Sequence, residues 1–312
     1  MGVGVAAFSQ RHLFEGFASI VTRLTWYWVG LAFIVEMGSV PPLAEAELIV
    51  LRAGGVHADR WRMNLVTLAS NAIAMSIPAG VAVAEGYTYS RYRQLGAEPA
   101  AAAWAELASG ALAFAALAAV ALAGGVLAGG PDSTVLVPTL AVVTVGSVGA
   151  AALFRHPHLL AAGLGWVERT FGRDRGSLVA RTTQRIGRTA GQLSFPHPDV
   201  ATWLTAFGLS LANWLMDVAA LAFAFLAAGG HVPWGVVLLA FAGAKVVSSI
   251  GITPGGLGIV EGGMVATFVA YGVQGPTAVA AVLVYRGLTY LGLVGIGWAA
   301  VGLLSLQRGR RG

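Results

Sequence analysis

The sequence predicts an all-α fold: a polytopic membrane helical bundle with two inverted repeats, each containing a re-entrant broken-helix hairpin. Composition is the first observation, because 57% of the 312 residues are hydrophobic and 11% are charged, whereas soluble domains carry about a quarter charged residues. Uncharged windows are the second, since most reach the roughly 20 apolar residues that a spanning helix needs. They are 107–131, 133–154, 218–244, 262–285 and 287–307. The third observation is a Pro–Gly break that recurs in both halves.

Charge and cysteine content narrow the function classes. The net charge is +5, and eighteen of the nineteen basic residues are Arg. Most of them lie in loops or at the C-terminus, where they are typical of topology signals facing anionic lipid. We therefore expect no nucleic-acid partner. The absence of Cys excludes disulfides and thiolate metal sites.

The chain divides into membrane halves joined by a basic connector. Seven Arg lie in residues 155–199, so the positive-inside rule predicts that this segment is cytoplasmic, as is the basic tail. We expect a multi-pass plasma-membrane protein with a cytoplasmic C-terminus. The predicted parts are an amphipathic or loose lead-in (1–22), a first membrane half (23–154), the connector (155–199), a second membrane half (200–306) and the tail (307–312).

The predicted helices follow in order. The aromatic cluster Trp26-Tyr27-Trp28 opens a long first helix to about Leu51, which we expect to be interrupted at Pro41-Pro42. The other full spans are expected at about 101–128, 134–154, 200–228 and 276–304.

A break interrupts the apolar region 234–272. Pro254 cannot donate a backbone hydrogen bond, and Gly255, Gly256 and Gly258 tolerate backbone angles that other residues avoid. We expect a helix to end near Thr253 and a second to begin near Gly258. In hydrocarbon, such a break is tolerated only where protein or a water-filled cavity satisfies the freed amides.

The same break occurs in the first half. Pro78-Ala-Gly-Val-Ala-Val-Ala-Glu85 aligns with Pro254-Gly-Gly-Leu-Gly-Ile-Val-Glu261, so Gly80 is also assigned to a hairpin tip. Repeated interrupted segments indicate a transporter site. The unpaired helix at 134–154 inverts the second half, which predicts five full spans and an external N-terminus. Alternatively, residues 63–84 cross completely and the N-terminus is internal.

At these residues the chain resembles the lysylphosphatidylglycerol synthase transmembrane family, also called flippase-like integral membrane proteins. The resemblance covers about residues 26 to 304. It is carried by Thr253-Pro-Gly-Gly-Leu-Gly-x-x-Glu261, Ala281-Val-Leu-Val-Tyr-Arg286-x-x-x-Tyr290, Leu51-Arg-Ala-Gly-Gly55, residues 71–80 and Asn213-Trp214-x-x-Asp217. It implies a lipid translocase or related carrier. Founding members add a soluble aminoacyl-transfer domain, which we expect to be missing here, so we expect no synthase or other enzyme activity.

Polar residues inside the apolar segments are the candidate transport path. They are Glu261, Arg286, Asp217, Lys245, Glu85, Asn71 and Tyr290. A charge deep in a bilayer needs a partner, so Arg286 pairs with Glu261 or Asp217, or binds an anion. Each residue also has a structural alternative: helix capping for the glutamates, static ion pairs for the charged groups, and interhelical hydrogen bonds for Asn71. Glu36, Glu45 and Glu47 are expected to face a cavity or an interface, and no role can be assigned to them.

The functional prediction is a carrier that moves a phosphate-bearing lipid head group between leaflets, with an anionic phospholipid or lipid-linked phosphate as its partner. One alternative is a non-transporting partner or regulator of a separate lipid-modifying enzyme. Another is a small-solute or ion carrier. A homo-oligomer is compatible with all three. We expect no catalytic residues, cofactor or metal, because the six His are scattered and no Gly-Lys-Ser/Thr follows the glycines.

Overall fold

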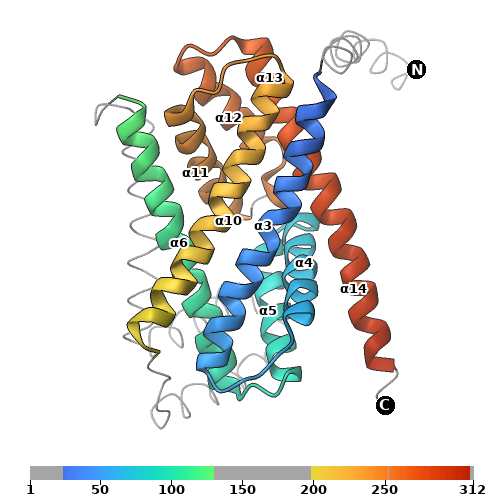
Figure 1. Ribbon diagram of the computed structural model, residues 1–312. Coiled ribbons are helices and arrows are strands. Elements are labelled where there is room, and N and C mark those ends of the chain that lie inside the picture. Colours follow the sequence, from blue (N-terminus) through green and yellow to red (C-terminus); the bar gives the residue numbers. More distant parts are fainter. Residues whose placement is uncertain (1–23, 130–197, 252, 310–312) are drawn as a thin grey trace, which may run out of the picture.

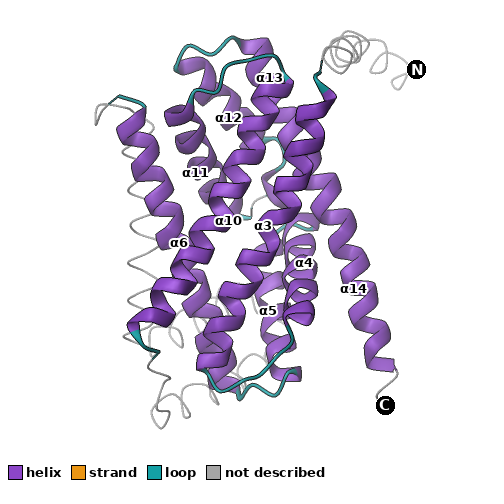
Figure 2. Ribbon diagram, viewed as in Figure 1, coloured by secondary structure: helices purple, strands orange, loops and turns teal. Residues whose placement is uncertain are grey.

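The computed structural model describes residues 24–129, 198–251 and 253–309. The lead-in 1–22, the helix expected at 134–154, nearly all of the connector 155–199 and the end of the tail therefore lie outside the described residues. Within the described ranges every regular element is a helix (Figure 2). The elements are α3 (Trp26–Ala53), α4 (Arg60–Ser76), α5 (Gly80–Gln94), α6 (Pro99–Leu127), α10 (Val200–Ala227), α11 (Trp234–Ile250), η1 (Pro254–Gly256), α12 (Ile259–Ala270), α13 (Gly275–Gly287), the π-helical η2 (Leu288–Leu293) and α14 (Val294–Gly309).

Three described helices are long and apolar enough to cross a membrane. They are Pro99–Leu127, Val200–Ala227 and Gly275–Gln307, the last formed by α13, η2 and most of α14. Each matches a predicted span within a few residues. The helical region continues to Gly309, so the predicted tail begins inside α14.

The predicted interruption of the first helix is wrong, because α3 runs for 28 residues through both Pro41 and Pro42. Two prolines remove two intrahelical hydrogen bonds, but α3 makes its most extensive contact with α10, and this packing outweighs the local preference. The side-chain amide of Asn213 on α10 also donates to the Ser39 carbonyl, 2.9 Å away, in the turn before the prolines.

Two short helix pairs approach each other from opposite ends of the bundle (Figure 1). The pair α4–α5 occupies the lower half of the view, and α11–α12 occupies the upper half. Residues 63–84 do not form one helix, since α4 ends at Ser76 and α5 begins at Gly80. The helix is therefore broken at the predicted hairpin tip, while the re-entrant path and the alternative of a complete crossing both stay predictions.

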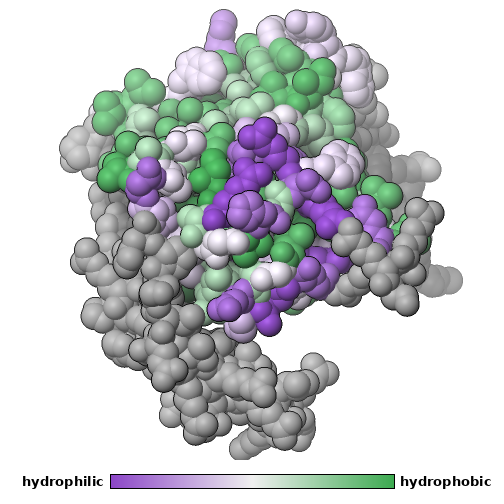
Figure 3. All heavy atoms as spheres, turned by 60° about the horizontal axis from the view of Figure 1, so that its bottom comes forward, coloured by the Kyte–Doolittle hydropathy of each residue, from purple (hydrophilic) through white to green (hydrophobic). Residues whose placement is uncertain are grey.

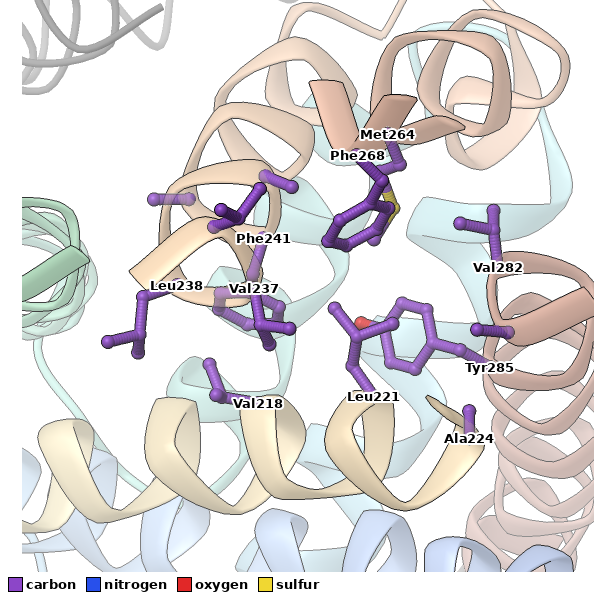
Figure 4. Packing of buried hydrophobic residues seen from close by; sticks show 14 of the residues in the cluster. Val218, Leu221, Ala224, Val237, Leu238, Phe241, Met264, Phe268, Val282 and Tyr285 are labelled. Carbon is purple, nitrogen blue, oxygen red and sulfur yellow. The ribbon is translucent and has the colours of Figure 1, made fainter. Parts of the chain in front are cut away.

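Each helix pair has its own hydrophobic core. The larger cluster joins α11 and α12 to α10 and α13 (Figure 4), and it includes the edge-to-face rings of Phe225 and Phe268, whose centroids are 4.7 Å apart. The second cluster surrounds Leu48, Tyr92 and Trp104 near the other end.

Hydrophilic side chains gather at the end of the bundle that is lowest in Figure 1, with hydrophobic flanks around them (Figure 3). This end contains the α3–α4 loop and the end of α5. There Arg60 pairs with Glu45 at 2.9 Å, and His57, Asp59, Arg62 and Gln94 line a polar surface pocket.

Candidate functional site

The turn between α11 and α12 is built from glycines in left-handed conformations. The φ angle is +71° at Gly251, +54° at Gly255, +74° at Gly256 and +83° at Gly258. Helix α11 ends at Ile250, slightly before the predicted Thr253, because Gly251 already adopts the left-handed conformation. Helix α12 begins at Ile259, directly after Gly258 as predicted. Residues with a Cβ are disfavoured at these angles, so the glycine content dictates where the chain breaks.

The first-half turn shows the same local conformation after its proline. Ala79 has φ +54° and ψ +23°, and the aligned residue Gly255 has φ +54° and ψ +21°. Ala79 is the one residue other than glycine with positive φ among the described residues. The local match ends there, since α5 begins at once at Gly80, whereas α12 begins three residues after Gly256. The inverted repeat of the complete halves stays a prediction.

Direct hydrogen bonds join the two turns. The Ala79 amide donates to the Gly251 carbonyl at 2.9 Å. The Tyr290 hydroxyl lies 2.5 Å from the Met75 carbonyl and 2.9 Å from the Pro254 carbonyl, so its single proton is shared between the two turns. These contacts fix the relative position of the two hairpins.

Arg286 binds Glu261 rather than Asp217. Its Nε donates to Glu261 Oε1 at 2.6 Å, and its Nη2 donates to the Gly255 carbonyl at 2.7 Å. The second oxygen of Glu261 accepts from the Gly258 amide at 2.6 Å. Glu261 therefore both caps α12 and neutralises an Arg that is 9% exposed. The structural alternative stated for Glu261 is present, and it links the turn to α13.

A second ion pair lies nearby. Lys245 Nζ is 2.5 Å from Asp217 Oδ2, and the Tyr285 hydroxyl donates to Asp217 Oδ1 at 2.6 Å. The ammonium also lies within 5.4 Å of the centroids of Trp214 and Phe241, close enough for cation–π attraction. Asp217 is almost fully buried and has both oxygens satisfied.

These groups surround a cavity of about 300 Å³ between the two turns. Five of the seven predicted path residues line it. The other two do not: Glu261 is hydrogen-bonded to the lining residue Arg286, and Tyr290 is hydrogen-bonded to the turn carbonyls. Sequence reasoning missed Ser248, Ser249 and Tyr285, which also line the cavity, and it assigned no role to Glu36, which lines it too. The five predicted residues are Asn71, Glu85, Asp217, Lys245 and Arg286.

Glu85 occupies the position of Glu261 in the repeat but has different neighbours. Glu85 acts electrostatically on the carboxyl groups of Glu106 and Glu47, and no Arg or Lys forms an ion pair with it among the described residues. Glu47 accepts a hydrogen bond from Thr67 at 2.7 Å. The two turns thus share one backbone conformation, at Ala79 and Gly255, and differ in charge. Within the described ranges, no group of His, Asp and Glu side chains is arranged to hold a metal ion.

Comparisons with known proteins agree with the family suggested by the motifs. Residues 1–297 match the family described as the lysylphosphatidylglycerol synthase TM region. A UPF0104 membrane protein of Methanothermobacter thermautotrophicus is 34% identical over 91 residues, which are 29% of this chain and 27% of that relative. The match thus spans about a quarter of the relative's length. On the extent of the first match, this chain is an integral membrane protein that belongs to the lysylphosphatidylglycerol synthase transmembrane-region family.

Proposed function

We propose that this protein is a lipid translocase that carries a phosphate-bearing head group between the leaflets of the plasma membrane. The observation that supports it most is the cavity of about 300 Å³ lined by charged side chains inside an apolar bundle. Pockets of about 300–1,000 Å³ hold small ligands. This cavity suits a compact head group, while the acyl tails stay in the bilayer.

The physical need for such a cavity is the charge of the head group. Moving an unpaired charge into hydrocarbon is strongly unfavourable, so a carrier must replace the water around it. The cations available are Lys245 and Arg286, each already paired with a carboxylate. The Gly258 amide is occupied by Glu261, so phosphate recognition falls to these two side chains rather than to the amides of the turn.

The arrangement of the helix pairs suits alternating access. Helices α11 and α12 have 17 and 12 residues, about 26 Å and 18 Å at 1.5 Å per residue, and are shorter than the roughly 30 Å hydrocarbon core. We propose that both pairs are re-entrant hairpins of inverted repeats. Rocking of one repeat against the other would expose the cavity to each side in turn.

The proposed orientation follows from the arginines. Arg52, Arg60, Arg62 and Arg93 lie in or beside the loops at the hydrophilic end, where α14 also ends (Figures 1 and 3). By the positive-inside rule this end would be cytoplasmic. The start of α3, at the opposite end, would then be external.

A leaflet-resolved flux assay tests the proposal. Purified protein is reconstituted in liposomes that contain fluorescent phosphatidylglycerol, phosphatidic acid or phosphatidylcholine, and dithionite quenching measures transfer between leaflets. We expect transfer of the anionic lipids. Glu261→Gln should abolish this transfer, because the substitution removes both the ion pair with Arg286 and the carboxylate cap of α12. The control Glu98→Gln, at the start of α6, should leave the transfer unchanged. Absence of flux for every lipid in well-folded protein would refute the proposal and favour a non-transporting partner of a lipid-modifying enzyme. Solute uptake without lipid transfer would also refute it.

A further inference from the structure

Glu36 is a buried carboxyl group that accepts no hydrogen bond from the described N–H and O–H groups. It lies in the middle of α3, is 1% exposed, and lines the cavity. No N–H or O–H group among the described residues donates to either of its oxygens, and the Asp217 carboxyl group lies within hydrogen-bonding reach of it. Buried polar groups are nearly always paired, so a buried carboxyl group that accepts no hydrogen bond needs a physical explanation, and two carboxyl groups within reach of each other can share a proton.

The charges around Glu36 leave no cation free for it. Among the neighbouring charges, those of Asp217 on α10 and Lys245 on α11 have the largest electrostatic effect on Glu36. These two groups already form an ion pair with each other. Arg286 on α13 is paired with Glu261. The Tyr285 hydroxyl donates to Asp217, and Glu85 on α5 carries the same charge as Glu36. Among the described residues, α4, α6 and η2 contribute no further ionisable side chain to the cavity lining.

The sum of these charges determines the state of Glu36. With both ion pairs neutral, an ionised Glu36 would be an uncompensated charge in a buried site, which is strongly disfavoured unless the group takes up a proton. A metal cation fits poorly, because the Lys245 ammonium already occupies the space 2.5 Å from Asp217. A proton needs neither extra oxygen ligands nor extra space.

We propose that Glu36 holds a proton in this conformation and is the proton-binding site that couples lipid movement to a proton gradient. The inference rests on the proposed lipid carrier and adds its energy source. When the cavity opens, the O–H bond of Glu36 breaks and the proton passes to water on that side. The carboxylate left behind then competes with Asp217 for Lys245, whose side chain is 24% exposed. Proton release thereby loosens the contact between α10 and α11.

The test measures the proton directly, without lipid transport. Infrared difference spectra of the full-length protein in detergent should contain the carbonyl stretch of a protonated carboxyl group. Glu36→Gln should remove one component of this band, whereas Glu36→Asp should retain a shifted one. The matched control is Glu45→Gln, a substitution on the same helix at a partly exposed glutamate that is paired with Arg60. An unchanged band in Glu36→Gln would overturn the inference.

Reconstituted protein supplies the second readout. An imposed pH gradient should accelerate lipid transfer by the wild-type protein and by Glu45→Gln, and this acceleration should be lost in Glu36→Gln. Wild-type flux that ignores the gradient would overturn the coupling while leaving the lipid carrier intact. A Glu36 band without any lipid flux would instead refute the carrier and keep the proton site. Melting in detergent verifies that all variants are folded.

Discussion

Removing the Arg286 side chain should destabilise the protein more than removing any exposed Arg. In Arg286→Met, Glu261 loses its 2.6 Å partner and the Gly255 carbonyl loses its 2.7 Å donor. Both sites are largely enclosed, since the side chains of Arg286 and Glu261 are 10% and 18% exposed. Breaking a buried ion pair from one side costs about 3–5 kcal/mol. The expected loss in free energy of unfolding is therefore about 3–5 kcal/mol.

The chain provides a matched control on its surface. Arg52 lies 3.9 Å from Glu45, and these side chains are 40% and 22% exposed. An exposed pair contributes about 0–1 kcal/mol because water and salt screen it. Arg52→Met should therefore have a small effect that shrinks further at high salt, while the effect of Arg286→Met should change little with salt.

The assay is reversible unfolding in mixed micelles, read by tryptophan fluorescence, over a double-mutant cycle with Glu261→Gln. Each single variant leaves one member of the pair uncompensated, and the double variant leaves neither charge. The double variant should therefore lose less than the sum of the singles, by about 0.5–3 kcal/mol. Strictly additive losses, or an Arg286→Met effect no larger than that of Arg52→Met, would refute the view that this pair holds the turn.

Two further predictions concern glycines of the turns. In Gly80→Ala the new Cβ would lie 2.3 Å from the Ala74 carbonyl oxygen, so the backbone must shift and the free energy of unfolding should fall by about 1–3 kcal/mol. The control Gly86→Ala, within α5 and with open space around it, should instead stabilise the protein by about 0.5–1 kcal/mol. Equal effects of the two substitutions in the same unfolding assay would contradict the argument. In Gly255→Ala the Cβ would lie 2.8 Å from the Tyr290 ring at a φ of +54°, so we expect a loss of about 1–3 kcal/mol and faster proteolysis at the turn. Unchanged proteolysis would show that the Tyr290 contact does not hold the two turns together.

Local chemistry explains what could be predicted from the sequence. Hydrophobic length dictates the spans at Pro99–Leu127, Val200–Ala227 and Gly275–Gln307, because a helix must satisfy its own backbone in hydrocarbon. Pro254 and the glycines around it dictate the second turn through backbone angles alone. The same local rules are misleading for Pro41 and Pro42, where contact with α10 keeps the helix intact.

Only the tertiary structure decided which polar groups meet. The sequence placed Glu261, Asp217 and Arg286 inside apolar segments but left the partner of Arg286 open, since pairing depends on which helices are neighbours. It indicated a cavity or an interface for Glu36 but no role, because the sequence does not show which polar groups lie across the cavity from it. Packing α3 against α10 brings Glu36 beside Asp217 and Lys245, and that arrangement of charges belongs to the assembled bundle and not to any one segment.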